Sequence, residues 1–288
     1  MLGNKVVQLA LESGHEVYSL HNKHPTNFGV SIRLDLTDKS KVSKVVSRLK
    51  PEAIIHAAAY TDVDGCEINK DQAWRVNAEA TRHIATASAS VGAHLTYVST
   101  DYVFNGKKGL YSEEDNPNPI NYYGYTKLKG EEFVRKQGKE YCIARPSVVY
   151  GWGRTDKPNF SMWLINSLDQ GSEVKILTDQ YVSPTLNTNL AEMLLEIMHR
   201  RITGILHTAG ATRTNRYKFA LKLAETFGLT TDLVKPAKID QMLWKARRPY
   251  DSSLNVSRAS ALLNVKPLRL KQALEMMKRE RIADDQSN

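Results

Sequence analysis

The chain has 288 residues, 41% of them hydrophobic and 25% charged, which predicts one large globular domain or a domain with a smaller appendage. Two distant cysteines, Cys66 and Cys142, argue against a disulfide framework or a metal knuckle and for a reducing cytoplasm. The net charge of +9 comes from dispersed basic residues, so we expect no nucleic-acid partner. No apolar run reaches the roughly 20 residues of a membrane helix, and Glu12 and His15 interrupt any signal peptide, so we expect no membrane partner either.

Short apolar runs alternate along the chain with amphipathic helical stretches, which is typical of a parallel sheet covered by helices on both faces. We expect strands at residues 16–20, 32–34, 53–58, 94–99, 141–149, 174–177 and 205–208. We expect helices at residues 2–13, 39–49, 72–90, 123–136, 186–200, 216–227 and 270–279.

The alternation is regular to about residue 150 and then becomes mixed, with longer polar loops at 151–159 and 232–251. The predicted fold is therefore α/β: a Rossmann-type doubly wound parallel sheet with a smaller C-terminal substrate-binding lobe. Residues 1–150 would form the dinucleotide-binding domain, and residues 151–288 would form mainly the lobe, with some chain returning to the core.

The start of the chain departs from this plan. A dinucleotide fold opens with a strand, a glycine-rich turn and a helix whose N-terminus holds the pyrophosphate. Here Met1 and Leu2 lead directly into a helical pattern. We therefore expect the sheet to lack its first strand, and Gly3 to be the last glycine of the phosphate-binding turn.

Tyr123 and Lys127 stand one helical turn apart and suggest a proton donor. With 13 tyrosines in a lysine-rich chain, about one such spacing arises by chance, and Tyr125 with Lys129 forms a second. At about 100° per residue, Tyr123, Lys127 and Gly130 lie on one stripe of the helix, and this stripe has little other polar surface. Tyr125 and Lys129 lie on a different stripe, which is charged. The first pair should therefore point inward and the second toward solvent.

A phenol with a pKa of about 10 is a poor acid, and a neighbouring ammonium lowers that pKa. Ser99, Thr100 and Asp101 end an apolar strand upstream, where a hydroxyl could hold the oxygen that receives the proton. This arrangement favours hydride transfer to a carbonyl with a tyrosine as general acid.

Several segments together resemble the dTDP-4-dehydrorhamnose reductase branch of the extended short-chain dehydrogenase/reductase family. The matching segments are residues 57–64, 97–106, 119–127, 130–131, 145–151, 247–249 and 254–255. The resemblance runs from about residue 3 to about residue 270. It implies NADPH-dependent reduction of the 4-keto group of a nucleotide-activated deoxysugar, in biosynthesis of activated sugars for cell-surface polysaccharide.

The resemblance also implies roles for the catalytic residues. Tyr123 would protonate the C4 oxygen, and Lys127 would lower the pKa of Tyr123 and hydrogen-bond the nicotinamide ribose. Thr100 would bind the substrate carbonyl oxygen, with Ser99 on the cofactor side and Asp101 on the substrate side assisting placement.

Further cofactor contacts follow from the same resemblance. The backbone at Ala57, Ala58 and Ala59 would lie against the dinucleotide, and Asp35 with Leu36 would flank the adenine. For Asp35 a simple N-cap of the helix from residue 39 is the alternative. Asn77 is expected to tie its helix to a neighbouring strand.

The end of the second expected Rossmann strand bears on the choice of cofactor. An acid there would bind the ribose 2′-hydroxyl of NAD, but residues 19–24 read Ser-Leu-His-Asn-Lys-His. The basic character, including Lys23, favours NADP(H), with NAD(H) as the alternative. Lys23 as an ordinary exposed loop lysine also remains open.

Substrate contacts are expected in the C-terminal lobe and beside the cofactor. The candidates are Thr61, Val63, Trp152, Arg154, Asn159, Arg247 and Arg248. The arginines serve equally well as surface ion-pair residues. The resemblance alone suggests Mg²⁺ at a contact within a homodimer, and no acidic cluster in the sequence places a metal site.

Two other functions remain open. The regulatory beta subunit of methionine adenosyltransferase resembles the same reductase branch, so a non-catalytic binding module is one alternative. A sugar-nucleotide epimerase that keeps its NAD bound is the other.

Overall fold

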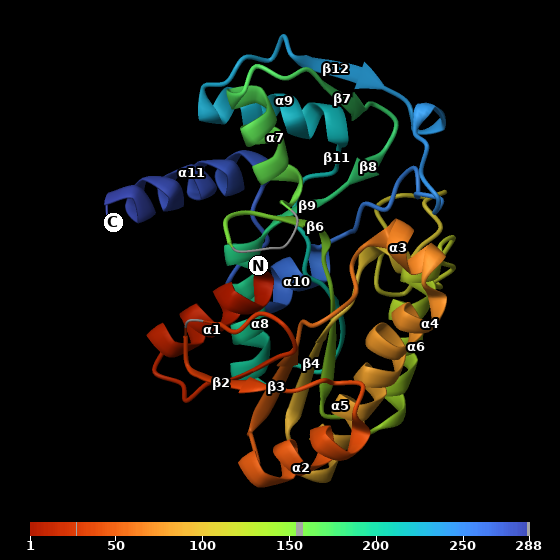
Figure 1. The fold of residues 1–288 in the computed structure, drawn as a ribbon, viewed down its shortest axis with the longest axis vertical. Helices are drawn as coiled ribbons and strands as arrows, with labels where there is room; N and C mark the ends of the chain where they lie inside the picture. The colour runs from red at the N-terminus through yellow and green to blue at the C-terminus, as the bar shows by residue number, and fades with distance from the viewer. Residues whose placement is uncertain (27, 154–157, 287–288) are drawn as a thin grey trace.

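The computed structural model of the chain describes residues 1–26, 28–153 and 158–286 (Figure 1). Its α-helices are α1 (Leu2–Glu12), α2 (Lys39–Leu49), α3 (Val63–Ile68), α4 (Lys70–Ala73), α5 (Ala80–Ser90), α6 (Tyr122–Lys136), α7 (Phe160–Asp169), α8 (Asn187–His199), α9 (Arg216–Phe227), α10 (Ser257–Leu262) and α11 (Leu270–Gln286). A π-helical turn spans Trp74–Glu79, and 3₁₀ turns span Asp101–Val103 and Ile239–Gln241. The strands are β1 (Tyr18–His21), β2 (Val30–Arg33), β3 (Ala53–His56), β4 (His94–Val98), β5 (Tyr141–Arg145), β6 (Ser147–Tyr150), β7 (Val174–Leu177), β8 (Tyr181–Val182), β9 (Pro184–Leu186), β10 (Gly204–His207), β11 (Thr214–Asn215) and β12 (Val234–Ala237).

The central sheet is parallel and has the strand order β10-β5-β4-β3. Strands β1 and β2 form a separate parallel pair, and no ladder joins this pair to the central sheet within the part of the chain that the structure describes. The α/β class with parallel sheets is thus confirmed. A first strand absent from the sheet stays a prediction.

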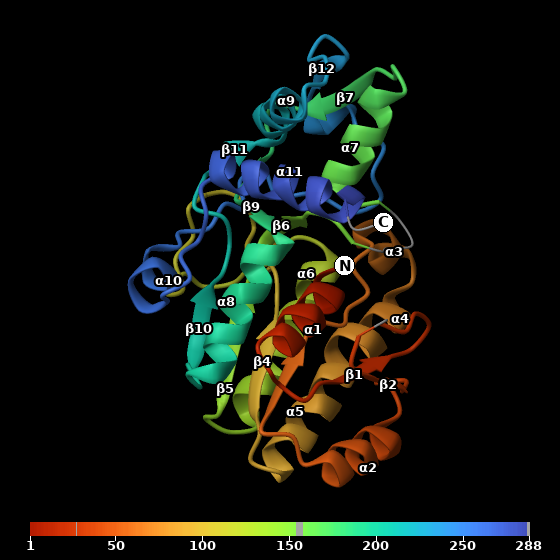
Figure 2. The same cartoon turned by 90° about the vertical axis from the view of Figure 1, so that its left-hand side faces the viewer.

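Helices cover both faces of the central sheet, as Figures 1 and 2 show: α1 and α8 lie on one face, and α2, α5 and α6 on the other. The strands explain this arrangement, because successive side chains point to opposite faces. On β5, Ile143 packs with Ile84 of α5, whereas Cys142 and Ala144 pack with Leu190 of α8. Both faces are therefore apolar, as a buried parallel sheet requires.

A second group of elements, which we call the α9 lobe, packs around its own core. It comprises α7, β7, α9, β12 and α11, at the top of Figure 1. Leu164, Phe219 and Leu274 from its three helices meet in this core. The N-terminus of α1 lies between the central sheet and the α9 lobe in both views.

Several element boundaries differ from expectation for local reasons. The strand expected at 141–149 divides into β5 and β6 at Pro146, which has no N–H to donate to a ladder. The helix expected at 72–90 is interrupted by the π-helical turn. The pattern also missed α3, α7 and α10, whose short or mixed apolar runs carry a weak periodic signal.

Candidate functional site

Helix α6 presents Tyr123 and Lys127 to the interior, as the helical phase predicted. Asn121 caps the helix by accepting a hydrogen bond from the Gly124 N–H at 2.9 Å. Tyr123 is 9% exposed, and the Lys127 side chain is almost fully buried. The neighbouring pair faces solvent: Tyr125 is 39% exposed, and Lys129 pairs with Glu132.

Lys127 is held by the end of strand β4. Its Nζ donates to the Val98 carbonyl at 2.8 Å and lies 4.2 Å from the ring centroid of Tyr97. Burial lowers the pKa of Lys127 to about 7, although Glu131 opposes the shift. The side chain therefore exchanges a proton near neutral pH.

The pKa of Tyr123 is raised overall, and the lowering influence expected from Lys127 stays a prediction. Burial is the main cause, and a hydrogen bond with the Thr100 side chain works in the opposite direction. The Tyr123 ring meets the Tyr102 ring edge-on, with 6.0 Å between centroids. In this environment the phenol holds its proton at neutral pH.

Thr100 and Asp101 form a buried polar network beside Tyr123. The Thr100 hydroxyl donates to the Asp101 carboxylate at 3.1 Å. Ser147 and Ser252 donate to the other carboxylate oxygen at 2.8 and 2.5 Å. Burial raises the pKa of Asp101, and these hydroxyl groups oppose the rise. The carboxylate thus positions Thr100 and joins three separate segments of the chain.

Ser99 points into a different network, beneath the site. Its hydroxyl donates to Glu131 at 2.6 Å. Arg145 donates to the same carboxylate through Nε at 2.8 Å and Nη2 at 2.6 Å, and both partners are buried. Ser99 therefore supports the strand end, and its proposed contact with a cofactor would have to come from another atom.

The loop after β3 is fixed by Asn77 in the π-helical turn. The Asn77 side chain accepts from the Tyr60 N–H at 2.8 Å, and donates to the Tyr60 carbonyl and the Thr126 hydroxyl at 3.1 Å each. This confirms that Asn77 ties its helix to the chain leaving a strand. Within the loop, Ala58 is exposed, and Ala57 and Ala59 are half-buried.

The first turn of α1, the alanine loop and Lys127 lie close together. Leu2, Ala57 and Val98 belong to one apolar cluster, and Lys127 binds the Val98 carbonyl. A Cβ added at Gly3 would meet no atom within 4 Å, so there is open space beside this turn. Small side chains, a helix N-terminus and a cation at one edge of the sheet fit a dinucleotide.

Asp35 is not the helix N-cap that we considered as its alternative role. Asp38 caps α2 by accepting from the Lys41 N–H, whereas Asp35 accepts from the N–H and hydroxyl of Thr37 at 2.9 and 2.8 Å. Asp35 is exposed, and Leu36 is half-buried against the core between α2 and α5. Their adenine contact stays a proposal.

The expected substrate residues are divided between the site and other parts of the molecule. Val63 packs in one cluster with Tyr102 and Tyr123, and Thr61 is exposed in the same loop. Trp152 lies elsewhere, because its indole N–H donates to the Met277 carbonyl of α11 at 2.7 Å.

The remaining candidates take different positions. Arg154 lies outside the described residues. Asn159 caps α7 and donates to the Gly151 carbonyl. Arg247 exposes its side chain, whereas Arg248 forms an ion pair with Asp64 at 3.1 Å near Val63.

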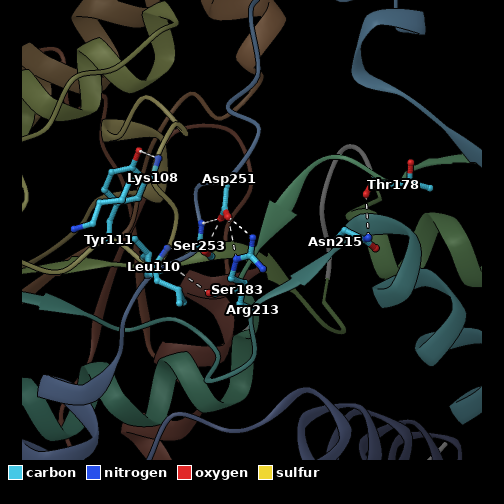
Figure 3. Close-up of polar contacts among 10 residues, drawn as sticks. Lys108, Leu110, Tyr111, Thr178, Ser183, Arg213, Asn215, Asp251 and Ser253 are labelled. Carbon is cyan, nitrogen blue, oxygen red and sulfur yellow. Dashed lines mark hydrogen bonds and ion pairs between the residues drawn. The ribbon is translucent and has the colours of Figure 1, made fainter.

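A C-terminal segment crosses back to the site and is held as Figure 3 shows. Asp251 accepts from Arg213 of the segment before α9, at 2.9 and 2.6 Å, and from the backbone and hydroxyl of Ser253. The Ser253 hydroxyl in turn accepts from the Leu110 N–H at 2.8 Å. These contacts place Ser252 against Asp101.

Sequence reasoning missed Tyr102, which packs against Tyr123, and also Gln180 and Arg216, which interact with Tyr102. Gln180 and Arg216 come from the chain beyond residue 150 and meet Tyr102 only through the tertiary fold. In the sequence, the signal that could have pointed to Arg216 was its place at the first position of an expected helix, directly after Asn215, where a cation is unusual.

Within residues 1–26, 28–153 and 158–286, no group of three or more His, Cys, Asp or Glu side chains is arranged to hold a metal ion. Among these same residues no helix is both long and apolar enough to span a bilayer.

Comparison with known proteins gives matches over nearly the whole chain. A family model described as the RmlD substrate binding domain matches residues 1–282. The probable low-salt glycan biosynthesis reductase Agl14 of Haloferax volcanii is 34% identical over 261 residues, which cover 89% of this chain and 87% of that protein. The methionine adenosyltransferase 2 subunit beta of Bos taurus is 30% identical over 236 residues, with 80% and 70% covered.

Solved structures are also similar to this chain over nearly its whole length. The crystal structure of a hypothetical dTDP-4-dehydrorhamnose reductase from Sulfolobus tokodaii has a TM-score of 0.84 and 40% identity, covering 93% of this chain and 94% of that one. The dTDP-4-dehydrorhamnose reductase of Bacillus anthracis in complex with NADP has a TM-score of 0.84 and 31% identity, with 96% and 97% covered.

Proposed function

This chain belongs to the RmlD substrate binding domain family, and we propose that it reduces the 4-keto group of a nucleotide-activated deoxysugar. The substrate would be of the dTDP-4-dehydrorhamnose type and the product of the dTDP-L-rhamnose type, an activated sugar for polysaccharide synthesis. The observation that carries this proposal is the convergence of Thr100, Tyr123 and Lys127 at the end of strand β4.

The chain's own residues can deliver the proton that this reduction consumes. Even the ordinary phenol pKa of about 10 leaves Tyr123 protonated at neutral pH, and burial raises that pKa further, so a proton is available for transfer. The Thr100 hydroxyl, which influences the pKa of Tyr123 from the adjoining strand end, would orient the C4 oxygen toward the phenol. Lys127, with a pKa of about 7, can return a proton to Tyr123 after transfer.

NADP(H) is the proposed cofactor, and bound in its reduced form it supplies the hydride. The N-terminus of α1 with Gly3, the loop of Ala57 to Ala59, and Lys127 would hold it. At the end of β1, Lys23 is exposed and no acid is present in residues 19–24, which favours a ribose 2′-phosphate over a free hydroxyl. The Bacillus anthracis relative bound to NADP supports this preference.

The test is loss of nicotinamide absorbance when NADPH and dTDP-4-dehydrorhamnose are mixed with the protein. Tyr123→Phe should lower the rate by about 10²- to 10⁴-fold, the usual contribution of a general acid. Tyr125→Phe is the matched control on the outer face of α6 and should keep the wild-type rate. Equal rates in the two variants would show that Tyr123 is not the general acid. Absence of turnover in the wild type would contradict the proposed function.

A second candidate function is a regulatory subunit that binds a partner enzyme. The similarity to methionine adenosyltransferase 2 subunit beta favours it. Under this alternative the protein would bind a methionine adenosyltransferase catalytic subunit in sedimentation analysis and show no keto-sugar turnover.

A further inference from the structure

Arg216 is the first residue of α9 and lies near Asp101 and Tyr102. Its Nε donates to Gln180 Oε1 at 3.1 Å, and its guanidinium is 5.2 Å from the ring centroid of Phe160. Its charge also interacts with the Tyr102 side chain. The residue is half-buried, and burial lowers its pKa.

This cation lacks a carboxylate partner at ion-pair distance among the described residues. The acid that influences it electrostatically, Asp101, already accepts hydrogen bonds from Ser147 and Ser252. Burial of a cation without an anion is unfavourable, and a cation in the first turn of a helix also opposes the helix dipole. The neutral contacts of Arg216 offset these penalties only in part, so its position indicates an anionic ligand.

The surroundings show where that ligand would lie. Tyr102 links Arg216 to Tyr123, because its ring meets the Tyr123 ring edge-on, with 6.0 Å between the centroids, and its side chain interacts with Arg216. Arg248 adds positive charge at the same place, because it acts electrostatically on both Tyr102 and Arg216. Asp64 and the Trp244 ring hold Arg248 in position.

We propose that Arg216, assisted by Tyr102 and Gln180, binds the diphosphate of the nucleotide sugar and so sets the distance of the sugar from Tyr123. The guanidinium suits this task because its planar donors pair with two phosphate oxygens at once. The inference rests on the proposed function for the identity of the sugar, whereas the anion subsite itself depends only on the contacts of Arg216.

Calorimetric titration with thymidine, thymidine diphosphate and uridine diphosphate tests the subsite without turnover. The wild type should bind at least one diphosphate more tightly than its nucleoside. Arg216→Gln should lower the affinity for that diphosphate by about 10- to 100-fold, the range of one to two charge-assisted hydrogen bonds. It should change the affinity for thymidine by less than about twofold. Arg216→Lys, which keeps the charge but loses the planar fork, should give an intermediate loss.

Lys218→Gln is the matched control, since it removes the same charge from an exposed side chain of the same helix. It should leave every affinity within about twofold of wild type. Equal losses in Arg216→Gln and Lys218→Gln, or equal losses for thymidine and the diphosphate, would overturn the proposal. So would a wild type that does not prefer the diphosphates.

The thermal midpoint of Arg216→Gln separates a binding role from a structural one. Because a half-buried cation without an anion is unfavourable for the fold, the thermal midpoint should be unchanged or higher, and a clear fall would contradict the inference. If Arg216→Gln loses affinity for the diphosphate selectively but no keto-sugar is reduced, the proposed function fails and the subsite stands. If reduction occurs and this selective loss is absent, the subsite alone fails.

Discussion

At the residue scale, the proposed proton chemistry rests on two residues, Tyr123 and Lys127. Burial raises the pKa of Tyr123 and lowers that of Lys127 to about 7, so each shift favours the neutral form. The phenol is thereby kept in the protonated state that reduction needs. Lys127 sits at the end of β4, where its ammonium binds the Val98 carbonyl.

The lowered pKa of Lys127 has a consequence for stability. Between its folded pKa of about 7 and its ordinary value of 10.5, the unfolded chain binds a proton that the folded chain does not. Stability contributed by this group therefore rises with pH across that window. We predict that the wild-type urea midpoint gains more from pH 7 to 9 than the midpoint of Lys127→Met. The same slope in both proteins would show that Lys127 titrates normally.

At the element scale, α6 must approach β4 and the π-helical turn closely. A Cβ added at Gly130 would lie 2.3 Å from the Tyr97 hydroxyl and 3.0 Å from the Asn77 carbonyl. Gly130→Ala should therefore destabilise by about 1–3 kcal/mol through overpacking, which exceeds the gain in helix propensity of about 1 kcal/mol.

Gly3→Ala in α1 is the control for this substitution, because no atom lies within 4 Å of the new Cβ. In urea unfolding it should leave the stability unchanged or raise it. A Gly130→Ala protein as stable as Gly3→Ala would show that α6 can shift away from the sheet.

The buried pair of Glu131 and Arg145 joins α6 to β5. Glu131→Gln leaves the Arg145 guanidinium without its anion, and breaking such a pair costs about 3–5 kcal/mol. Glu225→Gln removes an exposed pair with Lys222 on α9 and should change stability by less than about 1 kcal/mol. Equal midpoints in chemical denaturation for the two variants would contradict this difference.

Sequence alone was sufficient for features that depend on local periodicity. The stripe of Tyr123, Lys127 and Gly130 follows from 3.6 residues per turn, and the bounds of α2 and α9 follow from their apolar spacing and polar caps. Contacts between distant segments could not be found in this way. Trp152 donates a hydrogen bond to a carbonyl of α11, Ser252 donates one to Asp101, and Arg216 interacts with Tyr102. Each of these contacts joins segments that are far apart in the sequence.

At the scale of the whole molecule, the site lies where the sheet and the α9 lobe meet. The end of β4 and helix α6 contribute the proposed catalytic residues Thr100, Tyr123 and Lys127, and the proposed diphosphate subsite comes from Gln180 and Arg216. A substrate with a sugar at one end and a diphosphate at the other fits this division. The net charge of +9 adds a general attraction for such an anion.

We also propose that the exposed end of β1 sets the cofactor preference. Lys23→Glu places an acid where a 2′-phosphate is proposed to bind, and should weaken NADPH relative to NADH by about tenfold or more. Steady-state KM values for the two cofactors measure the change, with Lys218→Gln as control. An unaltered ratio would place the 2′-phosphate elsewhere.

The most direct test of 4-keto reduction follows a label from cofactor to sugar. NADPH carrying deuterium on the reactive nicotinamide carbon is incubated with dTDP-4-dehydrorhamnose, and the product is examined by mass spectrometry and proton NMR. The wild type should yield a dTDP-hexose with deuterium at C4, and Tyr123→Phe should yield almost none. Recovery of unchanged keto-sugar, or of product without deuterium at C4, would contradict the assignment of this protein as a 4-keto reductase.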